Sequence, residues 1–242
     1  MHLLEDCTVL YTRAAAYFPA FAAKIHALGG IAEHLPLVDT RRIALDADSA
    51  DYCRQADMLI FTSAAAVEHF PRELWRTQRN IAIGPATAAA VEAKQQALHL
   101  AAPPPFNSES LLSIFQPQEQ NIAIIAARGG RQLLHEQLNR HNRARFAFVY
   151  ERYNPSPHWC ADLSIPQALI LSSQAALNHL IEITAQATLN LLQSRTAVIA
   201  LSPRIGQAAQ GAGFQQVFAA AQADENAQIQ QLCQWWQTIK EY

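Results

Sequence analysis

A repeated segment is the strongest constraint on how this chain of 242 residues can fold. DMLIFTSAAAV at residues 57–67 matches QALILSSQAAL at residues 167–177. In each copy a short apolar run ends in two hydroxyl residues, and an alanine-rich segment follows. The apolar run is typical of a buried strand, and the alanine-rich segment of a helix. The chain therefore contains the same strand, turn and helix twice.

Two further segments extend the repeat. TVLYTR at residues 8–13 is similar to AIIAAR at residues 123–128, and IGPATAAAVEA at residues 83–93 is similar to LSPRIGQAAQG at residues 201–211. The elements follow the same order in both halves. Short apolar runs alternate with longer segments in which apolar residues have helical spacing, and this pattern predicts an α/β fold with parallel sheets. The ten expected strands are residues 8–11, 31–38, 58–61, 80–83, 98–102, 122–125, 146–150, 168–171, 197–200 and 215–218.

The repeat alone leaves the domain organisation open. Two sequential domains divided near residues 116–120 would have five strands each. The same holds if the chain crosses between domains near Pro36 and returns near residues 150–157. Proline in HLPLVDTRRI and in VYERYNPSPHW favours extended chain at both candidate crossings.

The composition limits the classes of partner and cofactor. With 20 acidic and 18 basic residues, the net charge is −2, so no overall field attracts nucleic acid or a membrane. No apolar run approaches the ~20 residues that span a bilayer, and MHLLEDCTVL is acidic where a signal peptide is basic. The cysteines form no CxxC and the histidines no metal-binding spacing. We expect a cytoplasmic protein with reduced thiols and no metal.

Polar residues follow many of the expected strands. Ligands of open parallel sheets bind beyond the carboxyl ends of the strands, where helix N-termini gather. Thr62-Ser63 and Ser172-Ser173 either cap the following helices or offer an anion-binding turn, and both interpretations are open. Arginine and glycine stand at further strand ends, with Arg13 and Arg128 at matching positions of the two halves. The sequence predicts an anion site at these ends.

Several known site motifs are missing from the sequence. It contains no GxGxxG, no GxxxxGK[ST] and no GxSxG, which argues against nucleotide binding and against covalent hydrolase chemistry. Tyr150 and Tyr153 in VYERY remain as candidate proton donors, although tyrosines in a strand commonly serve packing.

Seven segments are informative by their order and spacing: VLYTR, DMLIFTSAAAV, IGPATA, ARGGRQLL, the VY of VYERY, LILSSQAAL and LSPRIGQAAQGAGF. On these segments, the chain resembles the uroporphyrinogen-III synthase family over nearly its whole length. The resemblance implies two flavodoxin-like α/β domains with doubly wound parallel sheets, joined by a two-stranded connector, and an active site in the cleft. It places residues 1–36 and 156–242 in one domain and residues 40–150 in the other. The connectors are then residues 37–39 and 151–155.

The resemblance also implies an activity. Such enzymes convert the linear tetrapyrrole hydroxymethylbilane into uroporphyrinogen III, with loss of water and inversion of ring D, and use no metal or organic cofactor. By its place in VYERY, Tyr150 matches the tyrosine near the leaving hydroxyl. Many relatives carry Asn where this chain has Ala65, so a side-chain contact at that position is lost. The implied substrate contacts are Arg13, Thr62, Ser63, Thr87, Arg128, Gly129, Ser172, Ser173, Ser202 and Arg204.

Two other functions are alternatives to this one. Two α/β lobes around a hinge also describe a non-catalytic small-molecule binding or sensor protein, and a nucleotide-dependent transferase would need phosphate loops that the sequence lacks. We expect a monomer, because no heptad stripe or long exposed apolar face is present. The net charge leads us to expect that it binds neither nucleic acid nor a membrane.

Overall fold

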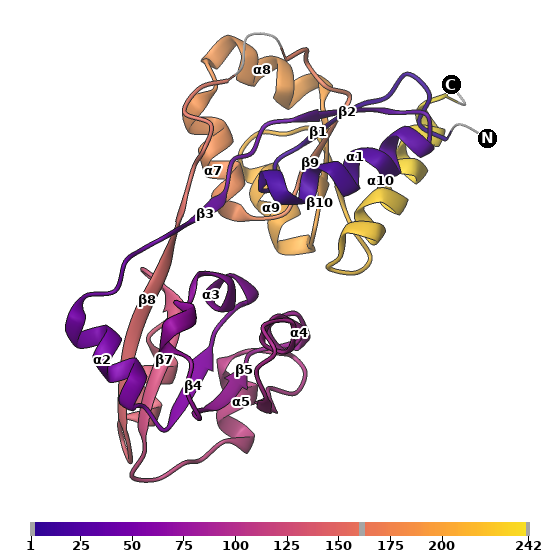
Figure 1. Ribbon diagram of the computed structural model, residues 1–242. Coiled ribbons are helices and arrows are strands. Elements are labelled where there is room, and N and C mark those ends of the chain that lie inside the picture. Colours follow the sequence, from indigo (N-terminus) through magenta and orange to yellow (C-terminus); the bar gives the residue numbers. More distant parts are fainter. Residues whose placement is uncertain (1–2, 160–162, 241–242) are drawn as a thin grey trace. The chain divides into compact units, whose positions relative to one another are not determined.

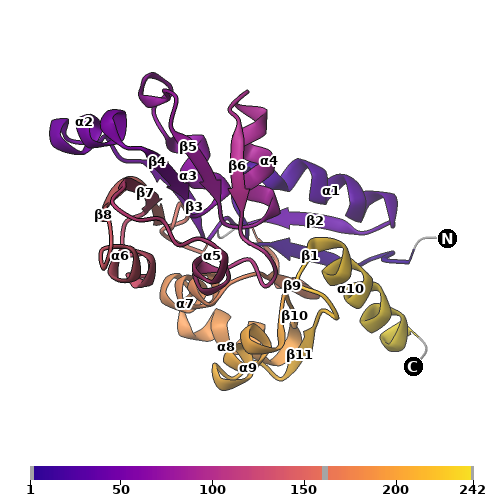
Figure 2. The same cartoon turned by 90° about the horizontal axis from the view of Figure 1, so that it is seen from below.

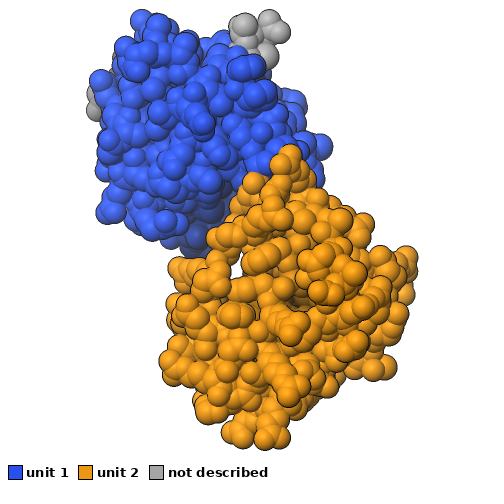
Figure 3. Space-filling model, turned by 90° about the vertical axis from the view of Figure 1, so that its left-hand side faces the viewer, with its two compact units in different colours: residues 1–39, 153–242 blue, residues 40–152 orange. Residues whose placement is uncertain are grey.

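The computed structural model describes residues 3–159 and 163–240. Its contacts divide the chain into two compact units, residues 1–39 with 153–242 (unit 1) and residues 40–152 (unit 2), which Figure 3 colours separately. Each unit is built on one sheet with helices on both faces. The predicted α/β class with parallel sheets is confirmed.

The sheet of unit 1 has five strands, and every pair within it is parallel. Counted along the chain of this unit, the spatial order of the strands is 2-1-3-4-5, which is the flavodoxin-like order. From one edge to the other, the strands are β11 (Gln216–Ala219), β10 (Ala197–Ala200), β9 (Ala168–Leu171), β1 (Thr8–Tyr11) and β2 (Ile31–His34).

Alternate residues of these strands face two separate apolar layers. Val9 and Ile170 pack with helices on one face, and Leu10 and Leu169 pack with helices on the other. Figures 1 and 2 show the two layers of helices. The first layer holds α1 (Phe18–Ala27) and α10 (Glu225–Lys240), and the second holds α7 (Gln174–Ile183), α8 (Gln186–Arg195) and α9 (Pro203–Gly211). A 3₁₀ turn, Ala15–Tyr17, precedes α1.

The sheet of unit 2 has six strands. Apart from the edge strand β3, the order is again 2-1-3-4-5 when the count begins at β7, so unit 2 is a circular permutation of the flavodoxin-like order. From one edge to the other, the strands are β3 (Asp39–Arg42), β8 (Arg143–Tyr153), β7 (Asn121–Ala127), β4 (Met58–Phe61), β5 (Arg79–Ala82) and β6 (Leu98–Ala101).

Helices cover both faces of this sheet as well. Leu59 and Phe61 pack with one set, and Met58 and Ile60 pack with the other. The first set is α2 (Ala47–Gln55), α3 (Ala64–His69) and α4 (Pro85–Ala93), with the 3₁₀ turn Arg72–Leu74, and the second is α5 (Ser108–Ile114) and α6 (Leu133–Leu138).

The sequence repeat is exchanged between the two sheets. By the repeat, β1 matches β7 and β9 matches β4, yet β1 pairs with β9 and β4 pairs with β7. The central pair of each sheet therefore takes one strand from each half of the chain. The unit boundaries fall inside β3 and β8, which pair with each other.

Two details of the expected strands are wrong. The described residues contain eleven strands, because β3 was missed: DTRR carries three charges and has no apolar alternation. The strand expected at residues 31–38 ends at His34, since Pro36 has no N–H to donate to the ladder. Within residues 3–159 and 163–240, no helix is both long and apolar enough to cross a membrane.

Candidate active site

Each sheet has one topological switch point, where the connections that follow two adjacent strands go to opposite faces of the sheet. In unit 1 this switch point lies between β1 and β9, and in unit 2 it lies between β7 and β4. Ligands of doubly wound sheets bind beyond the carboxyl ends of the strands at such points. The repeated hydroxyl pairs, Thr62-Ser63 and Ser172-Ser173, stand at these two places.

The switch point of unit 2 opens into a pocket of about 390 Å³. Four of the residues proposed from sequence line it, and they come from three different strand ends: Thr62, Ser63, Gly129 and Tyr150. The pocket is also lined by Ile83, Asn107, Ser108, Ala126, Ala127, Gly130, Arg131, Leu134, Phe146 and Arg152.

A break in strand register sets the direction of Tyr150. Ala126 faces Phe148 on β8, but Ala127 faces Tyr150, so β8 has one extra residue, Val149, at this point. A bulge of this kind turns the following side chain to the other face of the strand. Tyr150 therefore joins the same apolar layer as Val149 instead of alternating with it, and its side chain is only 2% exposed.

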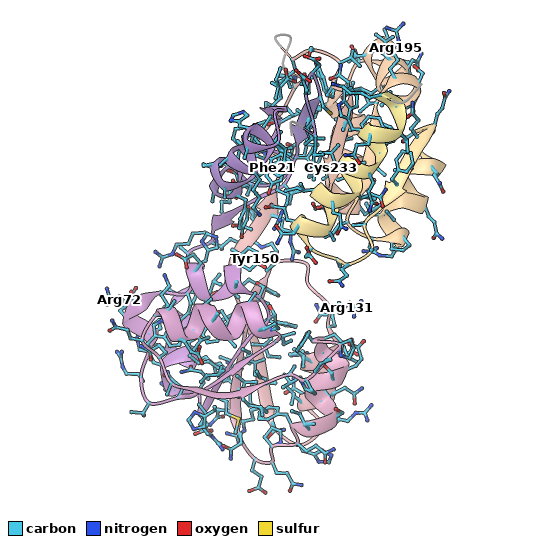
Figure 4. All side chains as sticks on the ribbon, turned by 90° about the vertical axis from the view of Figure 1, so that its right-hand side faces the viewer. Phe21, Arg72, Arg131, Tyr150, Arg195 and Cys233 are labelled. Carbon is cyan, nitrogen blue, oxygen red and sulfur yellow. The ribbon has the colours of Figure 1, made fainter. Side chains whose placement is uncertain are left out.

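The Tyr150 ring is held from two sides. Its hydroxyl oxygen lies 2.9 Å from Ser63 Oγ, and its ring stacks on His69 with the centroids 5.5 Å apart. The His69 ring is fixed in turn, because its Nε2 lies 2.9 Å from Thr40 Oγ1. Figure 4 shows Tyr150 in unit 2 with Arg72 on one side and Arg131 on the other.

Ser63 serves both of the purposes that the sequence left open. It is the N-cap of α3, where its Oγ accepts a hydrogen bond of 3.1 Å from the N–H of Ala66. That bond uses one lone pair and leaves the hydroxyl proton free. When Ser63 donates this proton to the Tyr150 oxygen, the phenolic O–H of Tyr150 is left to donate to a ligand in the pocket.

The turn after β7 forms the opposite wall of the pocket. Gly129 has φ of 77°, a left-handed conformation that glycine adopts without strain. The N–H of Arg128 bonds the carbonyl oxygen of Tyr150 at 2.9 Å, but the Arg128 side chain is 64% exposed and lies 3.7 Å from Glu151. Thr62 Oγ1 donates to the carbonyl oxygen of Ile125 at 3.0 Å and so ties β4 to β7.

Thr87 lies apart from this group. Its side chain is 3% exposed, and its hydroxyl donates to the carbonyl oxygen of Ile83, which precedes the N-cap of α4. The hydroxyl is thus bonded to the backbone of the turn that leads into the helix.

The remaining predicted residues gather at the strand ends of unit 1. Ser173 caps α7 by accepting from the N–H of Ala176 at 3.1 Å, and Ser172 Oγ lies 3.4 Å from Gln228 Oε1. Ser202 is the N-cap of α9, and Arg204 is exposed in its first turn.

Arg13 belongs to a charged cluster that sequence reasoning missed. Its guanidinium lies 3.6 Å from Glu225, which also accepts from Lys24 at 2.9 Å and from the Tyr11 hydroxyl at 2.8 Å. Burial, and then the hydrogen bond to Glu225, raise the pKa of Tyr11 above its ordinary value. Tyr11 therefore stays protonated. No sequence signal joins Glu225 to Tyr11, because 214 residues separate them.

Thiol chemistry has no place in either unit among the described cysteines. Burial raises the pKa of the Cys7 and Cys53 thiols to about 12, so neither forms the thiolate that a nucleophile requires. Cys233 is also buried and unpaired, and Cys160 lies outside the described residues. Among residues 3–159 and 163–240, no group of three or more His, Cys, Asp or Glu side chains could hold a metal ion.

The fold and the pocket define a class: two-unit α/β proteins with a phenol and hydroxyls gathered at the switch point of a flavodoxin-like sheet. Solved structures share the fold. A uroporphyrinogen III synthase mutant from Thermus thermophilus gives a TM-score of 0.63 at 16% identity, covering 98% of this chain and 100% of that one. The synthetase from Helicobacter pylori 26695 gives 0.64 at 15%, covering 96% and 100%.

Sequence comparisons identify the family. The model of the family described as uroporphyrinogen-III synthase HemD matches residues 19–230. A uroporphyrinogen-III synthase of Salmonella typhimurium strain LT2 is 26% identical over 248 residues, which cover 93% of this chain and 99% of that protein. The chain belongs to the uroporphyrinogen-III synthase family, and the predicted resemblance is confirmed.

Proposed function

We propose that this protein is a uroporphyrinogen-III synthase, a lyase that closes hydroxymethylbilane into uroporphyrinogen III. One carbon–oxygen bond breaks as the terminal hydroxyl leaves as water, and one carbon–carbon bond closes the macrocycle. Membership of the family supports the activity. The observation that carries the mechanism is the buried Tyr150 phenol in the pocket of unit 2, 2.9 Å from Ser63.

Tyr150 acts as the general acid in this proposal. A tyrosine hydroxyl within hydrogen-bond reach can donate a proton to the departing hydroxyl. Ser63, by donating to the phenolic oxygen, stabilises the phenolate that remains. The terminal pyrrole then attacks through its substituted carbon, the spiro intermediate reopens, and the free carbon of that ring closes the macrocycle. The proton lost in this last step restores the phenol.

The backbone of the two turns binds carboxylates in the same proposal. Free N–H groups at the start of α3 and in the turn at Gly129 are anion donors that need no side-chain charge. Thr62 is a structural residue in this arrangement, because its hydroxyl is already bonded to Ile125. Arg13, Ser172, Ser173, Ser202 and Arg204 remain predicted substrate contacts of unit 1.

We further propose that the enzyme works in the cytoplasm as a monomer. The buried, unpaired thiols of Cys7, Cys53 and Cys233 suit a reducing compartment. The pocket around Tyr150 is formed by one chain, so no second copy is required to complete it.

The test is cyclisation of hydroxymethylbilane by the purified protein, followed by chromatographic separation of the oxidised isomers. We expect uroporphyrinogen III to replace the uninverted isomer that forms without enzyme. If only the uninverted isomer appears, at the rate of the buffer control, the synthase activity is refuted and a binding function stands in its place.

A further inference from the structure

Arg152 is the most informative lining residue that the sequence did not reveal. It follows Tyr150 by two positions on β8, and its guanidinium carbon lies 5.9 Å from the centroid of the Tyr150 ring. Both residues line the pocket of unit 2. After the bulge at Val149 the strand alternates again, which brings Arg152 to the same side as Tyr150 and turns Glu151 away.

The neighbouring charges leave Arg152 free for a ligand. Arg41 and Arg128 both pair with Glu151, at 2.6 and 3.7 Å, and Arg131 pairs with Glu109 at 3.4 Å. Among the described residues, no carboxylate lies within ion-pair distance of Arg152. The pocket therefore contains an exposed guanidinium whose charge is not neutralised, beside a phenol that is almost fully buried.

We propose that Arg152 binds a carboxylate of the substrate pyrrole that carries the leaving hydroxyl, and so holds this pyrrole in the pocket of unit 2. The proposal rests on the function proposed above. On each pyrrole of the substrate the carboxylate arms stand on ring carbons, one of them adjacent to the carbon that bears the reacting group. A guanidinium beside the phenol matches that arrangement, and its fork geometry can bind a carboxylate with two parallel hydrogen bonds.

The volume of the pocket and the charge of the carboxylate indicate what the loss of Arg152 should do to KM and kcat. A pocket of about 390 Å³ is large enough for one substituted pyrrole of the substrate. The carboxylate is equally charged before and during loss of the hydroxyl, so Arg152 contributes equally to ground state and transition state. Loss of such uniform binding raises KM and leaves kcat nearly unchanged, whereas loss of an acid lowers kcat.

The test compares Arg152→Gln with Arg145→Gln. Arg145 lies on the same strand, its guanidinium carbon is 4.7 Å from the centroid of the Tyr52 ring, and it is not among the residues that line the pocket. Each variant thus loses one positive charge and one contact with an aromatic ring. Unfolding temperatures of both variants control for the fold, and Arg152→Lys retains the charge without the fork.

We expect KM for hydroxymethylbilane to rise about 10- to 100-fold in Arg152→Gln, less in Arg152→Lys, and less than twofold in Arg145→Gln. The Kd of the stable octacarboxylate uroporphyrin III, measured by fluorescence quenching, should weaken in the same order. The proposal is overturned if Arg152→Gln and Arg145→Gln have the same KM and Kd. In that case, an active wild-type protein still supports the synthase function. An inactive wild-type protein refutes both.

Discussion

Replacing Tyr150 by Phe removes one oxygen atom from the pocket and tests the acid role directly. The variant loses the hydrogen bond to Ser63 but keeps the ring stacked on His69. Ser63 retains its bond from the N–H of Ala66, so no capping group is orphaned. One neutral hydrogen bond is worth about 1 kcal/mol, or about 2–4 °C in Tm for a chain of this size. The fold should therefore persist.

Activity should fall much further than stability. General acid catalysis contributes about 10²- to 10⁴-fold, which corresponds to about 3–5 kcal/mol in the activation barrier. We expect that loss in kcat, with KM changed little, in stopped assays of hydroxymethylbilane consumption and isomer composition. Tyr52→Phe is the matched control, because the Tyr52 hydroxyl bonds the carbonyl of Arg143 outside the pocket. If Tyr150→Phe retains the kcat of the wild type and yields uroporphyrinogen III alone, Tyr150 is not the acid.

Four further substitutions test other parts of the structure. Ser63→Ala and Ser173→Ala each remove an N-cap, and each should cost about 1 kcal/mol of stability in thermal unfolding. Of the two, only Ser63→Ala should lower kcat, because Ser63 contacts Tyr150 and Ser173 does not. Gly129→Ala should cost roughly 1–2 kcal/mol because its φ is 77°, and equal unfolding temperatures would contradict that interpretation. The hydrogen bond from Ser49 in the first turn of α2 lowers the pKa of Asp46 below 3.8. The ionised Asp46 carboxylate therefore stabilises the folded state above pH 3.8, and this stabilisation is lost as the pH falls through the lowered pKa. The Tm difference between wild type and Asp46→Ala should accordingly narrow between pH 6 and pH 3; a constant difference would refute this.

The sequence predicted the elements whose pattern is local. Buried central strands such as MLIF and ALIL are continuous apolar runs, and their bounds, Met58–Phe61 and Ala168–Leu171, match the expectation. The edge strand β3 has no such run, because Asp39–Arg42 is held by pairing with β8 and not by burial. Strands that depend on a partner distant in sequence leave no periodic signal of their own.

The candidate site was predictable only in part, for the same reason. Hydroxyls after strands indicated the carboxyl ends of the strands, and Thr62 and Ser63 line a pocket there. Nothing in VYERY reveals the bulge that turns Tyr150, since the bulge is a property of its register with β7. Thr87 also follows a strand, but it lies in the first turn of α4, and its hydroxyl bonds the carbonyl oxygen of Ile83. Alternation could have indicated Arg152, two residues after Tyr150, had the direction of Tyr150 been known.

The repeat gives an internal comparison for the role of Tyr150. The offset of 110 residues that relates Leu59 to Leu169 also relates Ser63 to Ser173 and His69 to His179. Both serines cap a helix with equal hydrogen bonds, 3.1 Å in each case. The two units thus repeat the same strand, serine-capped helix and histidine at their switch points.

The position that Tyr150 occupies has a different residue in unit 1. Tyr150 faces Ala127 at the end of β7, and at the corresponding end of β1 the N–H of Leu37 bonds the carbonyl oxygen of Thr12. Leu37 is buried against α7 and its carbonyl contacts His179, much as Tyr150 is buried against α3 and stacks on His69. An isobutyl group can fill that space but cannot donate a proton. The same strand, turn and helix are therefore present in both units, but the position of Tyr150 in unit 2 is held by Leu37 in unit 1.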